Sequence, residues 1–289
     1  MRYYKGNLHM HTTRSDGVKT PGEALRLYKA AGYDFVALTD HYVYGEGGEA
    51  ENGLLVISGA EYDTGTNVRD GIYHIVGLGM ERDPGMVNTA KPCPQEIIDR
   101  IHQAGGLAVL AHPAWSLDTP EDIARKRGFD MLEIYNTLSG KPWNCRPYSG
   151  LIADMLAAQG IYYPLTAVDD AHFYVGDECR SYVMVRAEEL TQGAILAAIR
   201  RGDFYATQGP EFEYRAELYS DGSGLISVDC TPIERATFFT DRVYTPDRCA
   251  VGRRLTHVEY RVKPGERFVR FELEDAAGNA AWSGYVVRR

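Results

Sequence analysis

The stretch Asp34-Phe35-Val36-Ala37-Leu38-Thr39-Asp40-His41 shows the pattern on which the fold prediction rests. A short apolar run, rich enough in β-branched and aromatic residues to form a strand, ends on an acidic residue and a histidine. The same alternation of short apolar runs with helical segments extends from Tyr4 to about Gly202. Such alternation is typical of βα units around a parallel sheet. It predicts an α/β barrel, closed or nearly closed, with seven or eight strands.

Eight segments are predicted to be strands because each is short, apolar and bounded by turn or cap residues. They are residues 7–11, 34–41, 54–61, 74–79, 107–112, 131–135, 163–168 and 181–185. Helices are predicted between them. Thr20-Pro21-Gly22-Glu23 has the pattern of a capping box with proline at the first helical position, and Thr119-Pro120-Glu121-Asp122 repeats it. Further helices are predicted to start at Pro94, Ser149 and Thr191.

The sequence changes character after Gly209-Pro210. The segments that follow alternate apolar and polar residues and are separated by turn residues, which is typical of antiparallel strands. They are residues 211–220, 225–231, 236–240, 258–262 and 268–273. We predict a barrel over residues 1–207 and a small β-sandwich-like domain over residues 210–289. The expected role of the second domain is to cap the barrel or to mediate oligomerisation.

Composition excludes several classes of protein. The chain has 289 residues, with 40 acidic against 31 basic side chains and a formal net charge of −9, which argues against a surface built to bind a long nucleic-acid strand. No stretch of about 18 uncharged apolar residues is present, and the first residues lack the apolar core of a signal peptide. The five cysteines form no Cys-x-x-Cys pair, so free thiols in the cytoplasm are expected, with no membrane partner.

Histidines and carboxylates recur at the ends of the predicted strands. The carboxyl ends of barrel strands meet at one face, so residues there converge although they are distant in sequence. In an extended chain, His9 and His11 point to the same side, as a pair of metal ligands must. Mixed nitrogen and oxygen donors without thiolates suit zinc, manganese or iron. By contrast, His102 in a predicted helix and His257 in the β region are expected to be structural or surface residues.

Six motifs contain most of these polar residues. In chain order they are Asn7-Leu8-His9-Met10-His11-Thr12, Ser15-Asp16-Gly17, Leu38-Thr39-Asp40-His41, Gly59-Ala60-Glu61, Ala111-His112-Pro113 and Asp170-Ala171-His172. Together they resemble the polymerase and histidinol phosphatase (PHP) superfamily over nearly all of residues 1–207. The resemblance implies a distorted seven-stranded α/β barrel, two or three divalent metal ions and hydrolysis of phosphoester bonds. Residues 201–210 and the β tail are further similar to a subgroup of PHP-like metallohydrolases named after a carbaryl hydrolase.

The resemblance implies a role for each of nine metal-ligand positions. One metal would be held by His9, His11, Glu61 and Asp170. Glu61 would bridge to a second metal held by His74 and His112, and a third metal would be held by Asp16, His41 and His172. The expected catalytic residues are Glu61, Asp170 and His172, with Asp170 or His172 moving the proton.

Three positions depart from this pattern or leave a choice. Asp16 stands where some phosphatases of the superfamily have histidine, so the occupancy of the third metal site stays open. His74 begins its apolar run instead of ending it, which indicates an antiparallel strand or an extension of the strand. Asp169 is an alternative to Asp170, but only Asp170 stands two residues before His172.

Further polar residues near the motifs have two interpretations each. Asp40 is predicted to accept a hydrogen bond from a ligating imidazole, or it packs at the strand end. Glu133 and Asn136 are candidates for contacts with water or substrate, or belong to a polar rim. Arg14 and Arg180 are predicted to bind a substrate phosphate, with solvated surface arginine as the alternative.

The function predicted from these features is hydrolysis of a small phosphomonoester or a terminal phosphodiester by a metal-activated water. A short nucleic acid is also a candidate substrate, because metal ions would supply the positive charge that the surface lacks. The first alternative is a metal-dependent ester or carbamate hydrolase, since an activated water also attacks carbonyl groups. The second alternative is a metal-stabilised binding module without catalysis.

Overall fold

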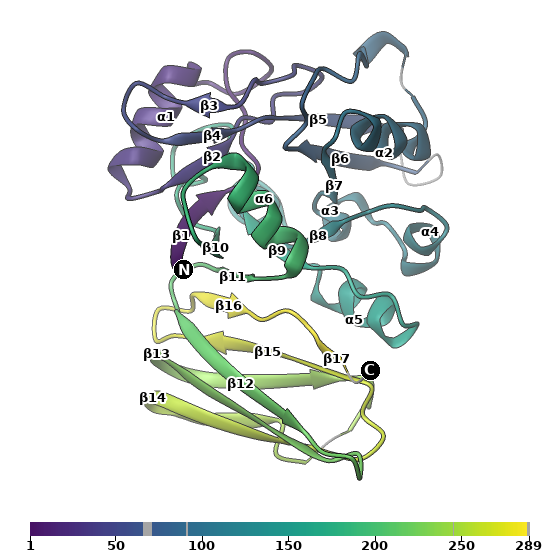
Figure 1. Ribbon diagram of the computed structural model, residues 1–289, viewed down its shortest axis with the longest axis vertical. Coiled ribbons are helices and arrows are strands. Elements are labelled where there is room, and N and C mark those ends of the chain that lie inside the picture. Colours follow the sequence, from purple (N-terminus) through teal and green to yellow (C-terminus); the bar gives the residue numbers. More distant parts are fainter. Residues whose placement is uncertain (66–70, 91, 245, 288–289) are drawn as a thin grey trace.

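The computed structural model describes residues 1–65, 71–90, 92–244 and 246–287. It shows a two-domain, mixed α/β protein in which strands predominate over helices (Figure 1). The described helices all belong to the first domain. They are α1 (Pro21–Ala30), η1 (Asn88–Ala90, a 3₁₀ turn), α2 (Pro94–Gln103), α3 (Pro113–Ser116), α4 (Pro120–Ala124), α5 (Gly150–Ala158) and α6 (Gln192–Arg201).

The predicted helix starts are confirmed, and side-chain caps explain those of α1, α4 and α6. The hydroxyl of Thr20 accepts from the backbone N–H of Glu23 at 3.4 Å, while the Glu23 carboxylate accepts from the backbone N–H of Thr20 at 2.9 Å. These two bonds form the capping box at the start of α1. The hydroxyls of Thr119 and Thr191 cap α4 and α6 by accepting from the backbone N–H of Asp122 and of Ala194, without the reciprocal bond of a capping box. Helix α6 ends at Gly202, whose φ of 76° lies in the left-handed region that glycine adopts freely.

The strands of the first domain belong to two sheets. One sheet contains β1 (Arg2–Asn7), β2 (Phe35–Ala37), β3 (Gly48–Glu49), β4 (Leu55–Ile57), β10 (Tyr182–Ala187) and β11 (Phe204–Thr207). The other contains β5 (Gly59–Thr64), β6 (Tyr73–Leu78), β7 (Leu107–Leu110), β8 (Met131–Asn136) and β9 (Leu165–Val168). Parallel pairing, as predicted, joins β1–β2–β4 and β7–β8–β9.

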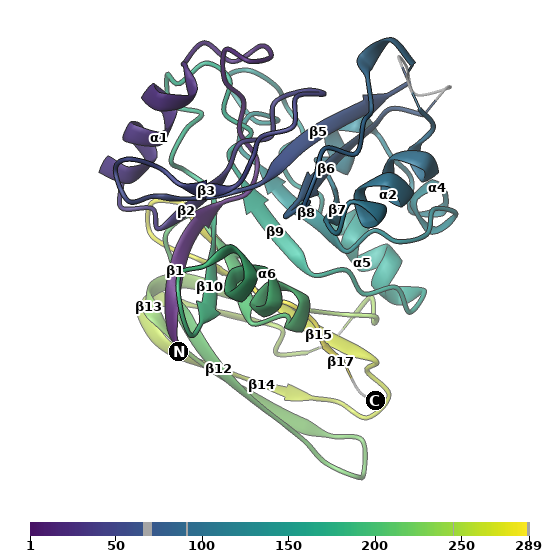
Figure 2. The same cartoon turned by 45° about the horizontal axis from the view of Figure 1, so that its top comes forward.

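The predicted closure into a barrel is not found among the described strands. The predicted strand 54–61 is divided between β4 and β5, which belong to different sheets. Strand β10 runs antiparallel to β1, whereas a barrel of βα units would pair them in parallel. Two isolated bridges, Met10–Ala171 and His41–Glu61, join the sheets just beyond the strand ends. The first domain is therefore a pair of sheets (Figure 2), and the bridges that join them lie at Met10 and His41, beside the histidines.

Two local predictions are corrected in their details. Strand β1 ends at Asn7, so His9 and His11 lie in the extended segment after the strand and not within it. Strand β6 is antiparallel to both β5 and β7, which confirms the antiparallel interpretation of His74. An antiparallel strand begins at the edge where its parallel neighbours end. His74 therefore reaches the same edge as the other histidines although it starts its strand.

Apolar clusters hold these layers together. The β1–β2 side and the five-stranded sheet enclose one cluster that includes Phe35, Val76, Val109 and Val183. Helices α2 and α5 cover the outer face of the five-stranded sheet with another cluster. Trp282 of the second domain belongs to this outer cluster, so the two domains share part of their core.

The second domain is an antiparallel β unit, as predicted. Its strands are β12 (Phe212–Leu218), β13 (Gly224–Thr240), β14 (Cys249–Val262), β15 (Phe268–Glu274), β16 (Ala280–Trp282) and β17 (Val286–Val287). The predicted strands 225–231 and 236–240 form the single strand β13, with register irregularities against β14 between them. Strand β16 pairs with β11, which extends the sheet of the first domain into the second. The domain limits at residues 207 and 210 stay a prediction.

In the part of the chain that the structure describes, no helix is long and apolar enough to cross a membrane.

Candidate metal centre

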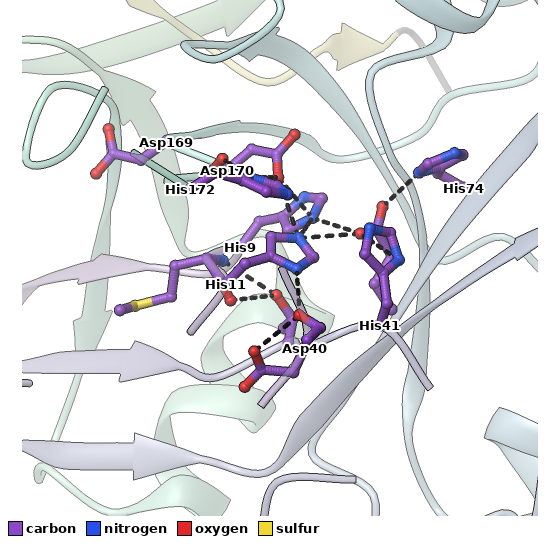
Figure 3. Close-up of polar contacts among 12 residues, drawn as sticks. His9, His11, Asp40, His41, His74, Asp169, Asp170 and His172 are labelled. Carbon is purple, nitrogen blue, oxygen red and sulfur yellow. Dashed lines mark hydrogen bonds and ion pairs between the residues drawn. The ribbon is translucent and has the colours of Figure 1, made fainter. Parts of the chain in front are cut away.

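The histidines and carboxylates singled out in the sequence meet at the end of the first domain where the sheets join (Figure 3). His9 and His11 follow β1, His41 follows β2, Glu61 lies in β5, and Asp170 follows β9. A backbone bond from Asp170 N–H to the carbonyl of His9, at 2.9 Å, fixes two of these segments side by side. Side chains from distant parts of the chain thus lie close together because they follow strands that end at the same edge.

Four buried side chains form the centre of the cluster. His9 and His11 are fully buried, and their Nε2 atoms lie 3.2 Å apart. The Glu61 Oε2 atom lies 3.2 Å from His9 Nε2 and 3.0 Å from His11 Nε2. The Asp170 Oδ1 atom lies 3.2 Å from both nitrogens. Two imidazole nitrogens and two carboxylate oxygens therefore point at one another, as the predicted first metal site requires.

The second predicted site lies on the other side of Glu61. His74 Nδ1 is 2.9 Å from Glu61 Oε1, and His112 Nε2 is 3.6 Å from the same oxygen. His41 Nδ1 lies 3.4 Å from Glu61 Oε2, so the compact donor group here is His41, Glu61 and His74. The structure therefore brings His112 to Glu61 as predicted and adds His41 as a neighbour of both sites.

The third predicted site is the most open to solvent. His11, Asp16, His41 and His172 form a donor group, in which Asp16 Oδ1 lies 3.4 Å from His172 Nε2. The Asp16 side chain is 57% exposed, unlike the buried donors of the centre. Gly17 lets this loop approach, because a Cβ there would lie 2.5 Å from the backbone of His11. The aspartate thus lies beside His172 at the solvent edge of the cluster, and its role as a metal ligand stays a prediction.

A second layer of residues orients the donors. Glu133 Oε1 is 2.7 Å from His9 Nδ1, and its Oε2 accepts from the backbone N–H of His112 at 2.9 Å. The Asn136 amide donates to Glu133 at 2.9 Å and to Asp170 Oδ2 at 3.1 Å. Neither Glu133 nor Asn136 lines the pocket described below. Both residues therefore support the donors from behind, a role that the sequence interpretation of water or substrate contacts missed.

The charged groups in the cluster shift the pKa values of their neighbours. Burial alone would lower the pKa of His9, but the carboxylates of Asp170, Glu61 and Glu133 raise it well above its ordinary value. Burial would raise the pKa of Glu61, whereas His9, His41 and His74 hold it well below its ordinary value. Burial also opposes the charge on His172, yet Asp16 and Asp170 raise the pKa of His172 to about 9. The carboxylates of the cluster thus favour positive charge at its centre.

The donors fit a metal ion on the evidence of their own geometry. Asp170 Oδ1 and His41 Nδ1 are buried and have ion-pair contacts within the cluster, but they form no hydrogen bond, which is costly for a buried polar atom. His112 and Asp170 have φ values of 31° and 55°, a left-handed conformation that is strained for residues other than glycine. Imidazole nitrogens with carboxylate oxygens are the donor set of zinc, manganese and iron.

A pocket of about 210 Å³ opens onto the donors. Among the described residues its lining includes Glu61, His74, His112, Asp170 and His172, together with Trp115 and the loop residues Leu138, Ser139 and Asn144. The Trp115 ring packs edge-on against His74 and His112, with ring centroids 5.4 and 5.0 Å away. A small substrate would thus meet donors on one side and an indole with a polar loop on the other.

Several predicted residues lie elsewhere. Asp169 points away from the histidines (Figure 3) and accepts from the hydroxyl of Tyr28 and from the backbone N–H groups of residues 179–181. This geometry favours Asp170 over Asp169 as the donor. Asp40 accepts from Thr12 and Ser15, and not from an imidazole, so it reaches His11 only through the Ser15 hydroxyl.

The two arginines predicted to bind phosphate are exposed and do not line the pocket. Arg14 borders a separate hollow with Tyr42 and Tyr44. The backbone of Arg180 donates to Asp169. A contact between either arginine and a substrate stays a prediction.

The surface role predicted for two other histidines agrees with their contacts. His102 pairs with Asp130 at 2.9 Å, and His257 pairs with Asp229 at 2.7 Å, both outside the pocket.

Two aromatic residues adjacent in the chain to pocket residues were not singled out in the sequence. Trp143 and Phe173 stack with ring centroids 6.3 Å apart and planes at 17°. Phe173 is 44% exposed and adjoins His172, while Trp143 adjoins Asn144, so both are next to pocket residues in the chain. Aromatic side chains in loops have no periodic signal, and only their adjacency to His172 could have indicated them.

Comparisons of the sequence with known proteins give two relatives. No family model matches the chain. It is 31% identical over 121 residues to the uncharacterized protein MJ1587 of Methanocaldococcus jannaschii, a match that covers 38% of this chain and 67% of that protein. It is 40% identical over 114 residues to a 5'-3' exoribonuclease of Haemophilus influenzae, with 35% of this chain and 41% of that protein covered. The chain thus spans less than half of the exoribonuclease.

A comparison of structures extends over both domains. A two-domain protein from Bacteroides vulgatus, which contains a predicted PHP-like metal-dependent phosphoesterase, matches with a TM-score of 0.56 and 16% sequence identity. The match covers 98% of this chain and 95% of that protein. At this identity the likeness is one of fold.

Proposed function

We propose, on the premise that this chain belongs to one family with MJ1587 and has the PHP-like metal-dependent phosphoesterase fold, that it hydrolyses phosphoester bonds. The substrate is a small phosphomonoester or a terminal phosphodiester. One observation carries the proposal: four buried donor atoms of His9, His11, Glu61 and Asp170 converge within 4.8 Å of one another.

The donors divide into places for two or three divalent cations, of which zinc, manganese and iron fit the chemistry. His9, His11, Glu61 and Asp170 would hold the first, Glu61, His74 and His112 the second, and Asp16, His41 and His172 the third. When bound, such cations lower the pKa of water and stabilise the charge that develops on the phosphoryl oxygens.

The protein's own residues contribute orientation and proton transfer. Glu133 fixes the ring of His9 through Nδ1, so that Nε2 faces the centre. Asn136 holds the Asp170 carboxylate through Oδ2, which leaves Oδ1 directed at His9 and His11. Asp170 and His172 both line the pocket, and one of them transfers the proton to the leaving oxygen. Trp115 limits water access at the pocket wall.

A second candidate is the removal of nucleotides from the end of a short RNA. The relative from Haemophilus influenzae is a 5'-3' exoribonuclease, and the exposed ring of Phe173, stacked on the half-buried Trp143, offers an aromatic face on which a terminal base would stack. The acidic net charge disfavours a long strand, so the substrate in this case is a short oligonucleotide or its end.

The test is hydrolysis by the purified protein loaded with manganese or zinc. A panel of an aryl phosphate, a 5'-phosphorylated oligoribonucleotide and an aryl ester separates the two candidates from ester or carbamate hydrolysis. His9→Ala is expected to abolish turnover. His102→Gln, a histidine whose carboxylate partner lies outside the pocket, is the matched control and is expected to keep full activity. Full activity of chelated, metal-free protein would refute the proposal.

A further inference from the structure

Arg270 of strand β15 is a fully buried cation at the contact between the two domains. In a strand, alternate side chains point to opposite faces. Val269, Phe271 and Leu273 point into the apolar core of the second domain. Arg270 and Glu272 therefore point to the other face, and there they meet the first domain. The guanidinium also lies over the Phe239 ring, 4.1 Å from its centroid.

Arg270 binds helix α5 of the first domain. Its Nε atom lies 2.5 Å from Asp154 Oδ1, and its Nη2 atom lies 2.7 Å from Asp154 Oδ2. This two-point geometry is the strong form of an arginine–carboxylate pair. The Nη1 atom donates to Glu272 Oε1 at 2.5 Å. All three side-chain nitrogens of Arg270 are thus engaged.

The same group holds Tyr148, the residue just before the cap of α5. The Tyr148 hydroxyl donates to Glu272 and lies 3.4 Å from Arg270 Nη2. Tyr148 closes the segment 137–149 that joins β8 to α5, and this segment supplies Leu138, Ser139 and Asn144 to the pocket. We refer to residues 137–149 as the pocket loop.

Backbone bonds transmit the position of Tyr148 through the pocket loop. The carbonyl of Pro147 accepts from Asn136 N–H at 2.9 Å, and Arg146 N–H donates to the carbonyl of Ser139 at 2.8 Å. The residues that lead into Tyr148 are therefore hydrogen-bonded to the part of the loop that contains Ser139, and Ser139 lines the pocket. Asn144 Oδ1 in turn accepts from the Trp115 indole at 3.1 Å.

We propose that Arg270 is a positioning residue of the pocket: with Glu272 it fixes Tyr148, and thereby holds the pocket loop against the donor cluster. The second domain then forms part of the working site instead of being an attached module. The expected effect on turnover rests on the proposed function. The positioning of the pocket loop by Arg270, Glu272 and Tyr148 does not depend on that function.

The test uses Tyr148→Phe in the metal-loaded, full-length protein, because this change removes the hydroxyl and keeps the ring. Hydrogen exchange of the amides in residues 137–149 is expected to rise about fivefold, the factor that corresponds to loss of one ordinary hydrogen bond. KM for an aryl phosphate is expected to rise by about the same factor, with kcat within about twofold, because the loop lines the pocket and contributes no residue to the donor groups. Metal content is expected to stay unchanged.

Arg267→Ala is the matched control. Arg267 directly precedes β15 and donates to the carbonyl of Ala158 in the first domain at 2.8 Å. Its other hydrogen bonds among the described residues go to Asp241 and not to the pocket loop. Loop exchange and KM are expected to be unchanged in this variant. Unchanged loop exchange in Tyr148→Phe would overturn the proposal, and so would raised exchange with unchanged KM. If the wild type hydrolyses none of the esters, the proposed function fails, and the exchange measurement still decides whether the loop is held.

Discussion

The protein buries two clusters of charged side chains. They differ in whether every polar atom of the charged groups has a hydrogen-bond partner within the chain. At Arg270, one guanidinium meets the carboxylates of Asp154 and Glu272, and each of its nitrogens has a partner. At the donor cluster, the ion pairs among the described residues join histidines to carboxylates, with no arginine or lysine among them. Asp170 Oδ1 and His41 Nδ1 remain without a hydrogen bond there.

This difference separates a structural cluster from one that awaits a ligand. Burying charge costs free energy unless opposite charge and hydrogen bonds compensate it. The Arg270 cluster supplies its own compensation, so it stabilises one arrangement of the two domains. The donor cluster would obtain compensation from cations. Variants in the two clusters should therefore differ in their response to metal.

The largest effect is expected from Glu61→Gln. This side chain contacts His9, His11, His41 and His74, and the change removes the charge while keeping the shape. We expect kcat/KM for an aryl phosphate to fall by about a thousandfold or more, since several kcal/mol of metal-dependent stabilisation are lost. Steady-state kinetics measure this. Glu96→Gln, in an exposed pair with Arg100, is the control. A loss below tenfold would contradict the central place of Glu61.

Arg270→Ala is expected to lower the free energy of unfolding by about 3–5 kcal/mol, because it leaves Asp154 and Glu272 as unpaired carboxylates at a buried contact. Urea unfolding measures the change. Replacing all three charges by apolar residues, as in Arg270→Met with Asp154→Leu and Glu272→Leu, is expected to recover most of the loss. Metal content of the folded variant should match the wild type. A loss of metal in Arg270→Ala would contradict the division between the clusters.

Removal of metal by a chelator is expected to destabilise the wild type by about 2.7 kcal/mol relative to protein held at a hundredfold excess of metal over Kd. Thermal unfolding with and without chelator measures this difference. Glu61→Gln should show a much smaller shift, because it binds metal weakly. Equal melting temperatures for loaded and chelated wild type would show that the donor cluster needs no cation.

Glu133→Gln is expected to have the smallest effect of the four. The Glu133 carboxylate uses one oxygen to accept from His9 and the other to accept from His112 and Asn136. The amide of glutamine has a single oxygen and can replace only one of these acceptors. Loss of such support typically costs about 10- to 100-fold in metal affinity or activity. Competition with a chelating dye measures the affinity. An unchanged affinity would show that Glu133 does not orient His9.

The sequence was sufficient for the starts of five helices, though not of α3, and for the histidines and carboxylates that gather at the strand ends. Thr20, Thr119 and Thr191 form the predicted caps, because capping depends on residues within one turn. Donors at strand ends were also found, since the end of an apolar run is a local feature. His74 was left open because its place depends on the antiparallel pairing of β5 with β6, which no local pattern specifies.

Longer-range features were beyond the sequence. Closure of the barrel was predicted from the number of strands, but whether β4 and β5 share a sheet depends on pairing between segments far apart. The support from Glu133 and the cluster at Arg270 likewise depend on which face of a strand meets which neighbour. Arg270 stands in a strand that alternates apolar and charged residues, and this local pattern gives no indication of its partner Asp154, which lies 116 residues away.

The pairing of β16 with β11 has a consequence for how this protein can be divided. Ala206 and Thr207 pair with Trp282 and Ala281, so a chain cut after residue 209 would keep β10 as a neighbour of its last strand but lose the partner on the other side. It would expose an unpaired strand edge next to the apolar surface that Trp282 covers, and such edges recruit other chains. Truncation is thus expected to produce aggregates, and the smallest unit suitable for crystallisation or assay is the two-domain chain.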